Sequence, residues 1–270
     1  MANNFLMGGK LGDFLHAMYA VKHLSERNDT AANVYMYDIG WEHGINNTWS
    51  ELKPILESQS YINELSVLKN YELHPVQTAQ QSKPILVYDL ELSMNGFTDL
   101  GAYIRSPLLY KACWSELYSK TFEFDTSNEY AWISYPKTNP DLLGKILIHR
   151  RYNPARLNPA FPYSDLLELY GDRMVFIGSS ELDYDNFPYK NEIPFYKVTT
   201  LDEWFSSVNS CEMMVSNLTA PTVIAHALDK KRIIELPNSA DAIHCIGEEK
   251  YSSNIFWYFN SNTNHMGNLL

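Results

Sequence analysis

The feature that most constrains the fold is an alternation of strand-like and helix-like segments in the second half of the chain. Short apolar runs predict buried strands at 145–149, 174–178, 211–216 and 232–236. The intervening segments have helical length and spacing at 163–169, 201–208 and 220–228. This alternation is typical of a parallel sheet covered by helices on both faces.

The first half has a similar beginning. Residues 3–7 predict a strand that enters a glycine-rich turn, and Phe14, Met18 and Val21 place apolar side chains on one face of a helix over 13–24. Further segments are predicted as strands at 33–39 and 84–90, a helix at 51–59, and a long loop holding Trp41, His43 and Trp49.

A segment rich in proline and glycine, 135–144, separates the two alternating series. We therefore predict an α/β protein with two Rossmann-like domains, 1–138 and 139–270, and a cleft between them. The last residues, from 252 onward, are polar and aromatic without clear periodicity, and packing back on the first domain is an arrangement left open for them.

Charge and cysteine content narrow the class of protein. The 21 basic residues are outnumbered by 32 acidic ones, a net charge of −11, which argues against a nucleic-acid wrapper or a binder of anionic membranes. The three cysteines, Cys113, Cys211 and Cys245, are widely spaced, so a disulfide framework or zinc site is not expected. Neither a signal segment nor an apolar stretch of about 20 residues is visible, which predicts a soluble, cytoplasmic protein without stable membrane insertion.

The turn at 8–13 is the first candidate site. Glycines between a strand and a helix let a ligand approach the backbone, and the helix N-terminus favours negative charge. The frames of a Walker A loop and of GxGxxG are both absent. Two interpretations of Asp13 stay open, a helix N-cap and a general base that takes a proton from a hydroxyl.

A basic cluster follows the predicted strand 145–149. Arg150, Arg151 and Arg156 lie where a parallel sheet binds ligands, and arginine side chains match phosphate geometry. The more specific interpretation of this cluster is a pyrophosphate-binding site. The alternative is a solvated loop whose arginines pair with nearby acidic residues.

A second turn ends the strand 211–216. Asn217, Thr219 and Ala220 precede or open the next helix, where backbone N–H groups and a hydroxyl can meet a phosphate. Plain N-capping by Thr219 is the alternative. Gly178 and Ser179 follow another strand and are expected to line the same cleft.

Two further features are given structural interpretations. The acidic pair in 183–185 has the letters of a DxD metal motif, but its polar surroundings predict solvated surface. His226 lies inside an apolar helix, where a satisfied core histidine is expected more often than a catalyst.

Taken in order, these motifs resemble the lipopolysaccharide heptosyltransferase family, whose members are inverting, metal-independent glycosyltransferases of the GT-B fold. The segment 9–17 resembles the family's opening motif, which has Gly-Asp, two apolar residues and His. The runs ILIHRR, MVFIGSS and MMVSNLTAPTVIAHALDKKRIIEL then follow in the family's order. The short chain looks like the compact, divergent members found in phage and polysaccharide gene clusters.

The resemblance implies specific roles. Asp13 falls on the proposed catalytic base, and the acceptor side would be shaped by Gly9, Lys10 and Gly12. One of Arg150, Arg151 and Arg156 would replace the basic residue of the phosphate loop, while the turn that holds the donor phosphates would match Asn217, Thr219 and Ala220. The implied substrates are a nucleotide-sugar and a carbohydrate or other hydroxyl-bearing acceptor, without a metal or cofactor.

The chain also departs from the family pattern. Val223 stands where the family has a histidine, and Leu218 replaces an aspartate. Two other functions therefore remain open: a sugar transferase acting on modified bases of viral DNA, and a non-catalytic nucleotide-sugar-binding module. A dinucleotide dehydrogenase is disfavoured because neither half has a GxGxxG turn.

Overall fold

The structure is a computed structural model that describes residues 3–68, 72–75, 85–88, 96–126, 131–237 and 240–258. The chain divides into two compact units, Met1–Thr126 and Ser127–Leu270. This division comes before the boundary predicted at 138/139, because residues just before that boundary bond to the second unit. The amides of Trp132 and Ile133 donate to the carbonyl of Ala227 at 3.0 and 3.1 Å.

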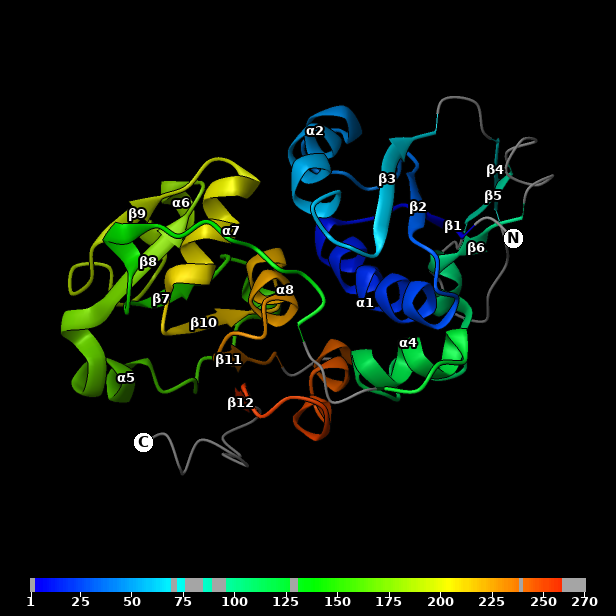
Figure 1. Ribbon diagram of the computed structural model, residues 1–270. Helices are drawn as coiled ribbons and strands as arrows, with labels where there is room; N and C mark the ends of the chain where they lie inside the picture. Colours follow the sequence, from blue (N-terminus) through cyan, green and yellow to red (C-terminus); the bar gives the residue numbers. More distant parts are fainter. Residues whose placement is uncertain are drawn as a thin grey trace. The chain divides into compact units, whose positions relative to one another are not determined.

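The first unit contains a four-stranded parallel sheet in the order β3-β2-β1-β6 (Figure 1). Its strands are β1 (Asn4–Met7), β2 (Ala32–Met36), β3 (Ile62–Val67) and β6 (Thr98–Asp99). Every residue of β1 is buried, as expected of a central strand covered on both faces. The predicted strands at 3–7 and 33–39 are both present, and the second ends earlier than expected.

Helices follow the first two strands of this unit. They are α1 (Leu11–Arg27) and α2 (Ile45–Leu56), and the 3-10 helix η1 (Leu100–Arg105) and α4 (Trp114–Phe122) come later. Helix α4 packs against α1 (Figure 1). Helix α2 begins before the predicted 51–59, so Trp49 lies in a helix rather than in a loop.

The strand predicted at 84–90 does not join the parallel sheet. Its described part, β5 (Ile85–Tyr88), pairs antiparallel with β4 (Glu72–Pro75) in a separate two-stranded sheet, and residues 84, 89 and 90 lie outside the described residues. The place beside β2 is taken by β3, which the sequence analysis missed. In β3 buried residues stand three apart, at Ile62 and Leu65, so neither the strand nor the helix period is clear.

The second unit contains a six-stranded, fully parallel sheet in the order β12-β11-β10-β7-β8-β9 (Figure 1). The strands are β7 (Ile146–His149), β8 (Met174–Gly178), β9 (Phe195–Lys197), β10 (Met213–Asn217), β11 (Arg232–Glu235) and β12 (Ile255–Tyr258). Numbered from β7, this is the doubly wound order 3-2-1-4-5-6. Its direction of winding switches between β7 and β10, so the ligand crevice of such a sheet is expected at the carboxyl ends of these two strands.

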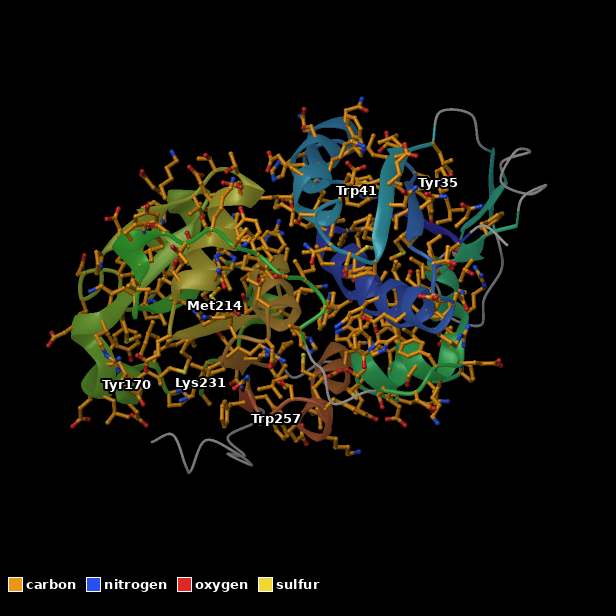
Figure 2. The ribbon with its side chains drawn as sticks, viewed as in Figure 1. Tyr35, Trp41, Tyr170, Met214, Lys231 and Trp257 are labelled. Carbon is orange, nitrogen blue, oxygen red and sulfur yellow. The ribbon has the colours of Figure 1, made fainter. Side chains whose placement is uncertain are left out.

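Both faces of this sheet are buried. Met213 and Val215 belong to one apolar cluster with Leu166 of α5, whereas Met214 of β10 (Figure 2) points to the opposite face, where α8 packs on β10. The helices are α5 (Tyr163–Tyr170), α6 (Glu181–Asp185), α7 (Leu201–Ser210) and α8 (Ala220–Ala227), with 3-10 turns η2 (Pro140–Leu142), η3 (Pro154–Arg156), η4 (Gly171–Arg173), η5 (Ala240–His244) and η6 (Glu248–Lys250).

Three details of this unit differ from the sequence prediction. The segment 183–185, for which the sequence predicted only solvated surface, forms the end of α6, whose N-cap Ser180 accepts a hydrogen bond from the amide of Leu182. Strand β9 was not predicted, and strand β12 emerges from the stretch that showed no periodicity. No helix in the described part of the chain is both long and apolar enough to span a membrane.

Candidate functional site

The loop that leaves β7 carries the basic cluster. We call residues 150–158 the arginine loop. Arg150 opens this loop as a buried residue, and its guanidinium forms two bonds with Glu235 at the end of β11, 2.8 Å from Nε to Oε2 and 3.0 Å from Nη2 to Oε1. The charge of Arg150 is therefore balanced inside the protein, a role that the sequence did not indicate for it.

Two more groups bind the Glu235 carboxylate. The Asn158 amide donates to Oε1 at 2.6 Å, and the Tyr163 hydroxyl donates to Oε2 at 2.8 Å. Burial opposes the charge of Arg150, but hydrogen bonding to Glu235 and its negative charge outweigh burial and raise the pKa of Arg150. Burial, followed by the Glu235 charge, raises the pKa of Tyr163 well above its ordinary value. Tyr163 is thus a neutral donor to an ionised pair.

The next residues of the arginine loop are exposed but held at two points. The side chain of Asn217 accepts from the Arg151 amide at 3.1 Å and donates to its carbonyl at 3.0 Å. The Tyr152 amide donates to Asp183 Oδ1 at 2.7 Å. The side chains of Arg151 and Arg156 are exposed on this tethered loop. The strand ends of β7 and β10 are thereby joined at the switch point of the sheet.

A chain of hydroxyl groups lies at the start of α8. Thr222 donates to the carbonyl of Asn217 at 2.6 Å, and its oxygen lies 2.6 Å from the buried hydroxyl of Ser216. Thr219 also donates to the Asn217 carbonyl, at 3.2 Å. Because Thr222 already satisfies that carbonyl, the Thr219 hydroxyl can turn to a ligand without leaving a buried acceptor unpaired.

Thr219 occupies the N-cap position of α8 but makes no side-chain capping bond, so N-capping by its hydroxyl, the alternative interpretation, is not what the structure shows. Ala220 is the first residue of α8 and is partly exposed. Gly178 ends β8 beside β7, and Ser179 next to it is exposed. Three neighbouring strands therefore bring the predicted donor-side residues to one edge of the second sheet.

His149, the last residue of β7, is buried beneath this edge. Its Nδ1 lies 2.9 Å from the carbonyl of Ile177, and its ring packs edge-on against Trp204. Burial lowers the pKa of His149, and this effect outweighs the hydrogen bond to Ile177, which by itself would raise the pKa. The imidazole is therefore neutral near pH 7, with Nδ1 as the hydrogen-bond donor.

The first unit places the turn 8–13 at the carboxyl end of β1. A Cβ on Gly8 would collide with the ring of the buried Tyr37, which would then have to move, and Gly9 has a φ of +110°. The exposed Lys10 is the N-cap residue of α1, Gly12 lies in its first turn, and Asp13 occupies the third helical position. The N-cap interpretation of Asp13 is therefore wrong. Its carboxylate instead lies in the first turn of α1, where a negative charge interacts favourably with the helix dipole.

Tyrosines surround the start of α1. The Tyr118 hydroxyl donates to the Asp13 carbonyl at 3.4 Å. Burial raises the pKa of Tyr103, and the negative charge of Asp13 raises it further. The pKa of Tyr118 is also raised, first by burial, then by Tyr103 and to a smaller extent by Asp13. Asp13 itself is partly exposed, so its carboxylate stands between a buried aromatic cluster and solvent.

Two observations lie away from these sites. A cavity of about 580 Å³ opens at the amino ends of β7 and β8, next to Lys145, Met174 and Pro194, which is the edge of the sheet opposite the arginine loop. His226 is buried against the ring of Trp132, as expected of a core histidine. Within the described ranges, no three His, Cys, Asp or Glu side chains gather as a metal-binding group.

Sequence reasoning missed the polar side chains that hold the loop in place. Only Glu235 had a signal in the sequence, since it directly follows two apolar strand residues, and a carboxylate that is buried there needs a partner. The other missed residues are Asn158, Tyr163, Asp183 and Thr222.

Known proteins were compared with this chain. No family model and no curated protein sequence matches it. Solved structures do match over nearly the whole chain. The E. coli heptosyltransferase WaaC with ADP has a TM-score of 0.59 at 11% identity, covering 98% of this chain and 95% of its own. The structural neighbours of the present chain thus include heptosyltransferases.

A glycosyl transferase family 9 protein from Veillonella parvula DSM 2008 has a TM-score of 0.56 at 14% identity, covering 96% of this chain and 88% of its own. WaaC with ADP-2-deoxy-2-fluoro heptose has a TM-score of 0.53 at 12% identity and covers 98% and 96%. These likenesses confirm the predicted resemblance at the level of fold, an α/β chain with parallel sheets and GT-B-like neighbours.

Proposed function

We propose that this protein is a glycosyltransferase that moves a sugar from a nucleotide-sugar donor to the hydroxyl of a carbohydrate or similar acceptor. In this proposal the two units are Rossmann-like domains with the reaction in a cleft between them. The mechanism inverts the anomeric centre and needs neither metal nor cofactor, and the enzyme works in the cytoplasm.

The observation that carries the proposal is the donor-side edge of the second sheet. The exposed Arg151, the redirectable hydroxyl of Thr219 and the beginning of α8 lie at the switch point of a doubly wound sheet. The exposed Arg156 lies further along the same arginine loop. Arginine side chains and helix N-termini both favour phosphate. The fold likeness to WaaC, whose structures contain ADP and an ADP-heptose analogue, supports a nucleoside diphosphate as the bound group.

In the proposed reaction, Asp13 accepts the proton of the acceptor hydroxyl as its oxygen attacks the anomeric carbon. A bond forms from this oxygen to the anomeric carbon, and the bond from that carbon to the diphosphate oxygen breaks. The electron pair leaves with the nucleoside diphosphate, whose negative charge Arg151, Arg156 and Thr219 stabilise. Partial exposure of Asp13 leaves its carboxylate accessible to such an acceptor.

The first test is a melting-temperature panel of nucleotides and sugar nucleotides, from the ADP, UDP, GDP, CMP and NAD series, with and without Mg²⁺. A ligand at 100 times its Kd stabilises the folded protein by about 2.7 kcal/mol. We expect one nucleoside diphosphate series to raise the melting temperature equally with Mg²⁺ and with EDTA.

The second test separates an enzyme from a binding module. A sugar nucleotide that binds is incubated with the protein, and release of the nucleoside diphosphate is followed with and without candidate acceptor glycans. Release supports the transferase, whereas tight binding with no release contradicts it in favour of a non-catalytic module. Stabilisation by NAD alone, or silence across the whole panel, also contradicts the proposal.

A further inference from the structure

We propose that Glu235 is a positioning residue, whose buried carboxylate holds the arginine loop in the shape that presents Arg151 and Arg156 to a nucleoside diphosphate. The inference rests on the proposed function for the identity of this ligand. The geometric part of the inference rests on the contacts that Glu235 makes with the two ends of the loop.

The Glu235 carboxylate binds both ends of the arginine loop. Arg150 opens the loop and donates to both carboxylate oxygens, and Asn158 closes the loop and donates through its backbone amide to Oε1. With the Tyr163 hydroxyl, four hydrogen bonds occupy the about four acceptor positions of a carboxylate. The side-chain amide of Asn158 adds a bond to the carbonyl of Leu236, 3.2 Å away. The loop is thus closed on the end of β11.

Residues 151–156 inside this closed loop are all exposed. Exposed residues have no core packing to hold them, so their placement depends on the polar contacts of the loop. Besides the Glu235 contacts, these include the bonds of Asn217 to Arg151, of Asp183 to the Tyr152 amide and of the Asn153 carbonyl to the Arg156 amide. Glu235 is fully buried, which makes its bonds the least accessible to competing water.

The glutamate carboxylate matches the four donors at this position. Glutamine at 235 offers a single acceptor oxygen and turns N–H groups toward those of Arg150, and aspartate is one methylene too short to reach both loop ends. Removing the charge also leaves the Arg150 guanidinium buried without its counter-ion. A Glu235→Gln substitution therefore loosens the loop at the Arg150 end, and at the Asn158 end as well when the amide nitrogen replaces Oε1.

The experiment compares wild-type protein with Glu235→Gln and with a matched control, Glu212→Gln. Glu212 pairs with Arg173 in an exposed ion pair before β10, at the opposite end of the strand. Affinity for ADP, or for the nucleoside diphosphate that the melting panel selects, is measured by calorimetry. Hydrogen–deuterium exchange follows the amides of Arg151 and Tyr152, whose acceptors are Asn217 and Asp183 and are unchanged in both variants.

We expect Glu235→Gln to weaken nucleotide binding about 10- to 100-fold, the range for losing a hydrogen bond to a charged group, and to speed exchange at both amides. Glu212→Gln is expected to match the wild type in both measurements. Wild-type affinity or wild-type exchange in Glu235→Gln overturns the inference. Absence of nucleotide binding in the wild type overturns the proposed function instead, and the amide exchange still decides whether Glu235 holds the loop.

A double variant separates positioning from stability. Arg150→Met with Glu235→Met removes both buried charges, so part of the melting temperature lost in Glu235→Gln should return. Because the loop ends stay untied, nucleotide affinity should remain reduced. Recovery of affinity together with the melting temperature would show that binding merely followed stability, and it overturns the positioning role.

Discussion

Replacing Arg150 by methionine tests the buried ion pair most directly. The Arg150 and Glu235 side chains are 9% and 0% exposed, so the change strands a buried carboxylate without its positive partner. Breaking such a pair costs about 3–5 kcal/mol. At about 2–4 °C per kcal/mol for a protein of this size, the melting temperature should fall by about 6–20 °C.

The comparison is Arg173→Met, which breaks an ion pair of the same residue types on the surface. Arg173 and Glu212 are 43% and 47% exposed, and an exposed pair contributes about 0–1 kcal/mol, so the melting temperature should fall by at most about 4 °C.

Both variants are followed by circular dichroism at 222 nm during heating, at equal protein concentration and without nucleotide. An equal, small loss in both would refute the reasoning, because it would mean that solvent screens the Arg150–Glu235 pair as it screens a surface pair.

Three further predictions concern the proposed site and its pH dependence. Asp13→Asn should lower the transfer rate about 10²–10⁴-fold, the usual effect of a general base, with nucleotide affinity unchanged; an unchanged turnover removes Asp13 from the mechanism. Thr219→Val should weaken nucleotide binding about 10- to 100-fold with little change in melting temperature, since Thr222 still satisfies the Asn217 carbonyl. If its melting temperature falls as far as that of Thr222→Val, the hydroxyl is structural. Burial lowers the pKa of His149 in the folded state, so the unfolded state binds a proton at higher pH than the folded state does. Folding stability is therefore lost as the pH falls below about 6.5, by up to about 1.4 kcal/mol per pH unit. His149→Gln should flatten urea-unfolding free energies measured between pH 7 and 5, and superimposable curves would contradict a buried neutral histidine.

Much of the second unit was predictable because the apolar runs of its strands suit the place those strands take in a sheet that is buried on both faces. The apolar runs ending at His149, Gly178 and Glu235 are too short for helices and are buried on both faces, so they read as parallel strands and formed them. The first unit was harder. Strand β3 exposes residues between its buried positions, and an apolar run that looked like a sheet strand became one half of an antiparallel pair.

The amino-acid sequence by itself determined the α/β class, the glycine turn before α1 and the position of the basic cluster at a strand end, because these follow from periodicity, backbone freedom and residue type along short stretches. Only the tertiary structure decided which arginine is buried in an ion pair and which arginines lie at the surface. Arg150 meets Glu235 across 85 positions of sequence, through the order in which β7, β10 and β11 lie side by side. An ion pair depends on distance in space, and strand order, which sets that distance, is a property of the whole sheet.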